Sequence, residues 1–119
     1  MPKKSISYKI INNKETISHA TTGILQDNII KYKEKDNTIV HFYYDKNILE
    51  RENNDLKLRY IFKEKEKTKG IIHIKEYNKD LEVDITTKNI KQKNDSLEID
   101  YIIENDEYHY QLEVIEWVY

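Results

Sequence analysis

Apolar and polar residues alternate with a period of two along much of this chain. The alternation is cleanest in five segments, whose apolar positions are Ile6, Tyr8 and Ile10; Leu56, Leu58, Tyr60 and Phe62; Leu81, Val83, Ile85 and Thr87; Leu97, Ile99, Tyr101 and Ile103; and Tyr108, Tyr110, Leu112 and Val114. Successive side chains of a β-strand point to opposite faces, so each segment predicts a strand with one buried and one solvated face. No segment sustains the period of an amphipathic helix.

Short polar clusters rich in Asn, Asp and Lys separate these segments at fairly even spacing. They occupy residues 12–14, 26–28, 35–37, 45–47, 52–55, 64–68, 78–80, 91–95 and 105–107. Asn and Asp tolerate the left-handed backbone that tight turns require. Nine turns predict about ten short strands. We therefore expect one all-β domain over residues 1–119, a single antiparallel β-barrel of about 8–10 strands.

Three segments depart from simple alternation. Residues 41–44 and 70–77 carry bulky side chains on both parities. There we expect either strands covered on both faces or bulges. At the C-terminus the apolar parity switches after Val114 to Ile115, Trp117 and Tyr119, which predicts a bulge near Glu116 or a strand end that packs elsewhere.

Several local motifs carry a resemblance. Leu58 and Arg59 lead to Phe62, a charged turn ends in Thr68-Lys69-Gly70, and a strand from Leu81 to Lys88 contains Leu-Glu-Val and Thr-Lys. With a further Thr-Gly at 22–23, the chain resembles the YwiB-like family of bacterial proteins over most of its length, most specifically over residues 49–90. It differs at residues 76–80, Glu-Tyr-Asn-Lys-Asp, where that family often has a Pro-Tyr-Gly-like turn. The resemblance implies a lipocalin-like, calycin-type barrel and no catalytic residue, because the family has no assigned biochemical role.

Charge is unevenly spread along the chain, whose net charge is −2. Residues 1–80 carry seventeen Lys and Arg against twelve Asp and Glu, and residues 81–119 carry three against ten. The asymmetry predicts either a basic binding face or acidic late strands that pair with basic earlier ones, and we favour the second interpretation. The chain has no cysteine, no signal-peptide core at its start and no membrane-spanning apolar stretch, so we expect a cytoplasmic protein without membrane contact.

Residue types that support catalysis or metal binding are sparse. The four histidines, His19, His41, His73 and His109, lie at least 22 residues apart, without a metal-ligand spacing. There is no Gly-x-Ser-x-Gly motif, and the two glycines cannot form a phosphate loop. We predict no catalytic residue, no cofactor and no metal ion, and we lean toward a protein that is not an enzyme.

One hairpin concentrates basic residues and could suggest a nucleic-acid site. This basic hairpin contains Lys57, Arg59, Lys63, Lys65, Lys67 and Lys69. Tyr60 and Phe62, the rings that would stack on bases, alternate away from the basic side chains, and Glu64 and Glu66 dilute the charge. We predict no nucleic-acid binding.

Tyrosine is the most informative residue type, with ten in 119 residues. Four lie on buried parities, Tyr8, Tyr60, Tyr101 and Tyr110, and Tyr32 follows less regularly. Small barrels hold either packed side chains or one small ligand, and tyrosine supplies both a ring and an orienting hydroxyl. Our leading functional hypothesis is that these four tyrosines bind a small amphipathic ligand inside the barrel. The alternative is a filled barrel that acts as an interaction module or homodimer through Ile115, Trp117 and Tyr119.

Overall fold

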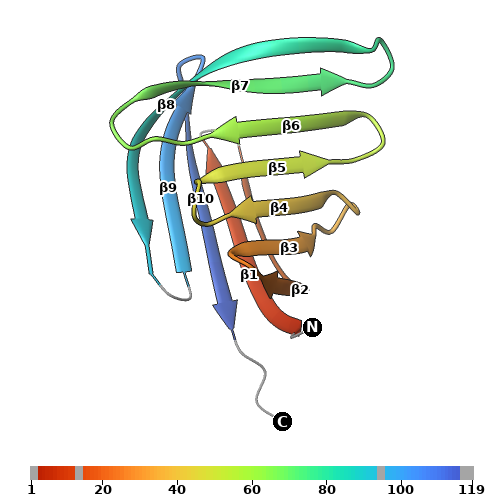
Figure 1. The fold of residues 1–119 in the computed structure, drawn as a ribbon, viewed down its shortest axis with the longest axis vertical. Coiled ribbons are helices and arrows are strands. Elements are labelled where there is room, and N and C mark those ends of the chain that lie inside the picture. Colours follow the sequence, from red (N-terminus) through yellow and green to blue (C-terminus); the bar gives the residue numbers. More distant parts are fainter. Residues whose placement is uncertain (1–2, 13–14, 94–95, 116–119) are drawn as a thin grey trace.

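The computed structural model describes residues 3–12, 15–93 and 96–115 (Figure 1). In chain order the strands are β1 (Lys3–Asn12), β2 (Thr16–Gln26), β3 (Ile29–Lys33), β4 (Ile39–Tyr43), β5 (Ile48–Glu52), β6 (Leu56–Ile61), β7 (Lys67–Ile74), β8 (Lys79–Gln92), β9 (Ser96–Ile103) and β10 (Asp106–Ile115). Each strand pairs antiparallel with the next, and β1 pairs with β10 to close the barrel. The prediction of an all-β, antiparallel barrel is confirmed, and ten strands are the upper end of the expected range.

The barrel has two sets of strands that run in different directions. Strands β3 to β7 cross one side, while β8, β9, β10 and β1 run steeply to them (Figure 1). Strand β8 joins the two sets, because residues 79–86 pair with β7 and residues 85–92 pair with β9. A register shift between Thr87 and Asn89 marks a bulge in β8, and it moves the buried parity from Thr87 to Ile90.

The structure excludes one of the two alternatives expected for residues 41–44 and 70–77. The ladders of β4 and β7 have no register shift, so these strands do not bulge where they are paired. In β4 the buried Val40 and Phe42 alternate with half-buried Ile39, His41 and Tyr43. The bulge expected near Glu116 and the side chains of Ile115, Trp117 and Tyr119 lie outside the described residues.

Left-handed residues confirm how the turns are made without glycine. Among the described residues, eight that are not glycine have positive φ, namely Asp27, Asn28, Asn37, Asn47, Lys65, Asn78, Glu104 and Asn105. Asp27–Asn28 and Glu104–Asn105 each supply two consecutive left-handed residues, as a two-residue type I′ hairpin requires. The turn expected at 105–107 therefore lies slightly earlier, and Asp106 already belongs to β10.

The apolar parity of the five clean segments faces the core. Ile6, Ile85, Leu97, Ile99 and Leu112 are fully buried in one cluster. Leu81 is the exception at 41% exposed, because, in the part of the chain that the structure describes, residues 79–84 of β8 pair with β7 alone. The interior of the barrel is thus lined by the residues that the period of two selects.

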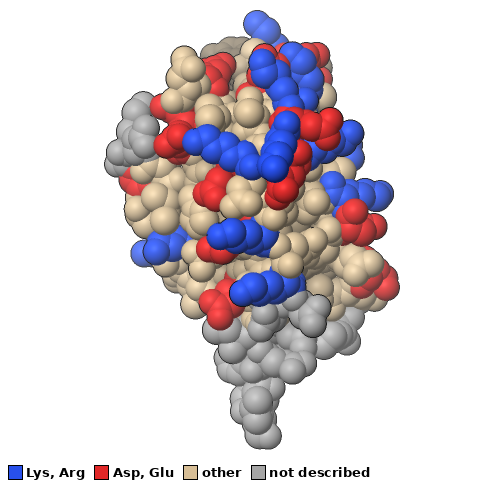
Figure 2. Space-filling view, turned by 90° about the vertical axis from the view of Figure 1, so that its left-hand side faces the viewer, with Lys and Arg blue, Asp and Glu red and all other residues tan. Residues whose placement is uncertain are grey.

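Charges of opposite sign intermix on the face of the barrel that Figure 2 shows. Lys69 of β7 pairs with Asp84 of β8 over 2.5 Å, which joins the basic early part of the chain to its acidic late part. Lys88 and Glu107 form another exposed pair at 2.6 Å. Of these two pairs, only Lys69–Asp84 joins adjacent strands and has the early-to-late pairing that the cross-strand interpretation expects, and exposed pairs contribute little stability. Among the described residues, none forms a helix with the length and hydropathy needed to cross a bilayer.

Candidate functional site

Aromatic side chains of the barrel interior form two groups. The first contains Tyr8 of β1, Tyr32 of β3 and Tyr110 of β10, all at most 3% exposed. Tyr8 and Tyr32 stack with ring centroids 5.1 Å apart, and the hydroxyls of Tyr32 and Tyr110 are 2.7 Å apart and share a hydrogen bond. Tyr32, which the sequence indicated only weakly, is thus the link between two of the predicted residues.

The second group surrounds Tyr101 of β9, which is 5% exposed. Its ring lies 4.9 Å from that of Phe62, 6.4 Å from that of Tyr60 and 5.3 Å from that of Tyr108. Edge-to-face and stacked pairs of this kind add to the gain from burying the rings. The four predicted tyrosines therefore all point inward, two in each group.

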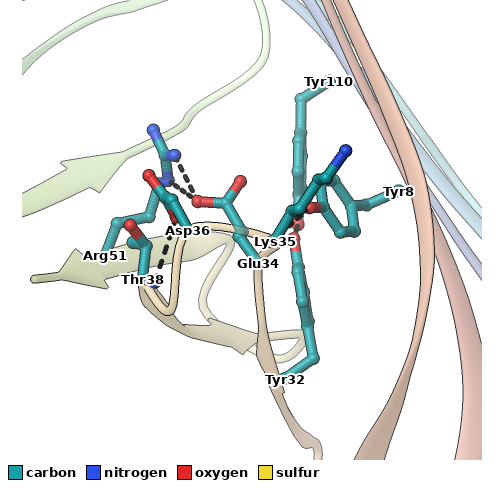
Figure 3. A network of polar contacts seen from close by, with 8 residues as sticks. All are labelled: Tyr8, Tyr32, Glu34, Lys35, Asp36, Thr38, Arg51 and Tyr110. Atoms are coloured by element: carbon teal, nitrogen blue, oxygen red, sulfur yellow. Dashed lines mark hydrogen bonds and ion pairs between the residues drawn. The ribbon is translucent and has the colours of Figure 1, made fainter.

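A buried ion pair lies beside the first group (Figure 3). Glu34 follows β3 on the same parity as Ile30 and Tyr32, and Arg51 lies on the inward parity of β5 with Leu49. Arg51 Nε donates to Glu34 Oε1 over 3.0 Å, and a second guanidinium nitrogen donates to the same oxygen. The Glu34 side chain is 5% exposed and that of Arg51 is 29% exposed, so the pair is enclosed on the Glu34 side and reaches water on the other.

The turn between β3 and β4 holds Glu34 in place. The N–H of Glu34 donates to the carbonyl of Thr38, and the N–H of Thr38 donates to the carboxylate of Asp36 over 3.1 Å. The hydroxyl of Tyr8 accepts a hydrogen bond from the N–H of Lys35 over 3.2 Å. The turn, the ion pair and the first tyrosine group therefore form one connected polar network.

Burial and charge act in opposite directions on the tyrosines. Burial raises the pKa of Tyr8, Tyr32, Tyr60, Tyr101 and Tyr110 above the ordinary value. The positive charge of Arg51 opposes this rise in pKa at all five. Burial would lower the pKa of Arg51, but the Glu34 carboxylate outweighs it and raises the value. Arg51 is thus a charge that lowers the pKa of tyrosines in both groups.

An open pocket of about 410 Å³ gives access to this network at the mouth of the barrel. It is lined by Tyr8, Ile17, Glu34, Lys35, Asp36 and Arg51. Its volume falls in the range of small-molecule sites. A guanidinium carries five N–H donors, and Glu34 accepts two from Arg51. Within the part of the chain that the structure describes, the other three have no protein acceptor.

A second open pocket, of about 470 Å³, lies across β1, β8, β9 and β10. Its charged side chains already bind one another, because His109 Nδ1 lies 2.6 Å from Asp100 Oδ1 and Lys88 pairs with Glu107. No three His, Asp or Glu side chains among the described residues form a metal-binding group. We therefore take the mouth pocket, where Arg51 has uncommitted donors, as the candidate site.

Sequence reasoning missed Glu34 and Arg51. Neither was singled out in a chain that is 35% charged. A signal was present, because each continues the inward alternation of its strand, after Tyr32 and Leu49 respectively. Opposite charges on two buried parities could have indicated an interior ion pair.

These features place the molecule among small, closed, antiparallel β-barrels with a partly polar interior. Its fold is similar to the crystal structure of the ywiB protein from Bacillus subtilis, with a TM-score of 0.65 over 98% of this chain and 91% of that chain. The two sequences are 16% identical, so the likeness confirms the predicted resemblance as one of fold and carries no function. No family model and no curated protein matches the sequence.

Proposed function

We propose that this protein is a non-enzymatic barrel that binds a small amphipathic ligand, with an anionic group anchored by Arg51. The ligand's apolar part contacts Tyr8 and Ile17, the aromatic and aliphatic residues of the pocket wall. The observation that carries the proposal is an open pocket of about 410 Å³ that joins an enclosed ion pair to a buried tyrosine. A cysteine-free chain suits the reducing cytoplasm, and we place the protein there.

The anionic group follows from the hydrogen-bonding pattern. Both bonds from Arg51 converge on a single oxygen of Glu34, so the guanidinium does not form its preferred two-oxygen fork. A carboxylate, sulfonate or phosphate at the mouth would accept the remaining N–H donors. Glu34 then keeps the guanidinium oriented toward the pocket.

Titration with anilinonaphthalene sulfonate, a fluorescent aromatic amphiphile with one sulfonate, tests the proposal. We expect saturable one-to-one binding that weakens by about tenfold or more in Arg51→Met, since a hydrogen bond to a charged group contributes about 1.5–3 kcal/mol. Arg59→Met is the matched control, because the Arg59 side chain is 56% exposed on the outer face.

Partial unfolding must be separated from loss of the site. A loosened barrel binds this dye more strongly, whereas loss of the anchor weakens binding, so the two effects have opposite signs. The double variant Glu34→Gln with Arg51→Met removes both charges and avoids leaving a buried carboxylate unpaired. Unchanged affinity in a folded double variant would refute the role of Arg51.

A further inference from the structure

Half of β2 has an open edge. β2 pairs with β1 through residues 16–24 but with β3 only through residues 23–26. Within the described ranges, residues 16–22 therefore have no strand on their other side. All seven are exposed except Thr21, which is half-buried, and Ile17 is 40% exposed.

The open edge lacks the residues that normally prevent strand addition. Residues 16–22 read Thr-Ile-Ser-His-Ala-Thr-Thr, with no Lys, Arg, Asp, Glu or Pro in a chain that is 35% charged. The open stretch of β8, residues 79–84, instead carries four charges, Lys79, Asp80, Glu82 and Asp84. Edge strands are commonly protected by such charges, so the β2 edge is the one that remains competent to pair.

We propose that residues 16–22 of β2 pair antiparallel with the same residues of a second copy of this chain. A two-fold axis at His19 places Ile17 opposite Thr21 and Ser18 opposite Ala20. In an antiparallel pair, every second residue directs its N–H and C=O toward the partner strand. This register therefore forms about six hydrogen bonds if those are the odd-numbered residues and about eight if they are the even-numbered ones. The partner must be uncharged and β-prone along its edge, and the strand itself meets that requirement.

The two faces of the joined strands differ in a way that suits pairing. Ile17 and Thr21 lie on the same face as their β1 neighbours Ile10 and Ile6. On this face, Ile17 of one copy would contact Thr21 of the other across the joined strands. Ser18 and Ala20 face outward beside Lys9 and Ser7, where small side chains leave room for a second barrel.

The expected dimer is weak. Seven residues extend about 24 Å, and a sheet about 10 Å thick would cover roughly 240 Å² on each partner. Counted over both partners, roughly 480 Å² lies well below the ~1,200 Å² total of the smallest standard stable interfaces, so we expect a dissociation constant of about 10⁻⁵ to 10⁻³ M. Sedimentation velocity up to about 1 mM covers this range, and a monomer throughout would overturn the proposal.

A cysteine cross-link tests the register, because the chain has no cysteine of its own. Directly opposed residues have Cα atoms about 4.5–5.5 Å apart, within the range of a disulfide. We expect His19→Cys to form a covalent dimer under mild oxidation and Leu81→Cys, on the charged β8 edge, to remain largely monomeric. Equal cross-linking by both would overturn the proposal.

Charge reversal at one position provides a second test. In the proposed register, position 18 of each copy lies opposite position 20 of the other. The double variant Ser18→Glu with Ala20→Lys therefore forms two pairs of opposite charges across the two-fold axis. The double variant Ser18→Glu with Ala20→Glu forms two pairs of like charges there. Both variants keep the same contact between position 18 and Lys9 within the monomer. We expect the first to dimerise at least about tenfold more tightly than the second. Equal dissociation constants would refute this register.

Discussion

Replacing Arg51 with Met removes the positive charge beside Glu34 and keeps an unbranched side chain. The Glu34 side chain is 5% exposed, and an enclosed carboxylate without its partner costs about 3–5 kcal/mol. Water reaches the pair from the Arg51 side, which is 29% exposed, so we expect the low end, about 3 kcal/mol. Glu34→Gln leaves the more accessible charge unpaired and should cost about 1–2 kcal/mol.

The double variant Glu34→Gln with Arg51→Met should lose much less stability than the sum of the single variants. Removing both charges leaves no buried ion, so we expect a loss of about 1–2 kcal/mol and a coupling energy of about 2–4 kcal/mol. Urea unfolding followed by circular dichroism at neutral pH gives the three free energies of unfolding.

An exposed pair of the same type provides the control for this cycle. Arg59 Nε lies 3.9 Å from Glu50, and the two side chains are 56% and 23% exposed. The cycle Arg59→Met with Glu50→Gln should give a coupling below about 1 kcal/mol. A coupling at Glu34–Arg51 no larger than at this surface pair would refute the view that the mouth network stabilises the barrel.

Three further predictions concern packing, pH and partners. Gly23→Ala should destabilise the fold by about 2–3 kcal/mol and Gly70→Ala by about 1 kcal/mol, measured by urea unfolding. A Cβ at Gly23 would lie 2.7 Å from the backbone oxygen of Lys31, whereas a Cβ at Gly70 would meet only side-chain atoms, the nearest being those of Tyr60 and Ile85. The reverse order of the two losses would contradict this reasoning. Burial raises the pKa of Tyr32, Tyr101 and Tyr110, so as pH rises the unfolded chain loses these three protons before the folded chain does. The free energy of unfolding should therefore fall above about pH 10, by about 1.4 kcal/mol per pH unit for each of these tyrosines. Urea unfolding at several alkaline pH values that gave a constant free energy would contradict this. Fluorescence anisotropy should detect no binding of mixed-sequence single-stranded DNA or RNA tighter than about 10⁻⁴ M at physiological salt, and micromolar affinity lost on charge reversal in the basic hairpin would prove this wrong.

The strands and turns could be predicted because their signals are local. Alternation identified buried positions such as Ile85 and Leu97, and six of the eight left-handed residues described are Asn or Asp. The bulge at Thr87–Asn89 could not be placed, because both parities around it carry acceptable residues and the shift serves the bend of β8 between two sets of strands. The bulge is a consequence of closing the barrel, and the local sequence around it does not indicate that closure.

The candidate site could be predicted only in part. Inward tyrosines follow from parity, but their division into two groups depends on which strands face each other across the barrel. Glu34 and Arg51 lie 17 residues apart and meet only because β3, β4 and β5 are consecutive neighbours. A Glu or an Arg in a sequence can be buried or exposed. A buried charge can be predicted only when the inward and outward alternation of a strand is followed through its polar positions as well as its apolar ones.

One geometric cause underlies both proposed sites. β2 meets β3 only at residues 23–26, and the gap beside its first half exposes an unpaired backbone edge and opens the mouth pocket, whose wall includes Ile17. If a second copy adds a strand at this edge, the contact between Ile17 and Thr21 forms at the lip of the ligand site. Any change that the strand makes in ligand affinity must then be matched by an equal change that the ligand makes in dimer affinity, because coupling free energies are reciprocal. The short β2–β3 ladder is therefore the feature through which ligand binding and self-association would be linked.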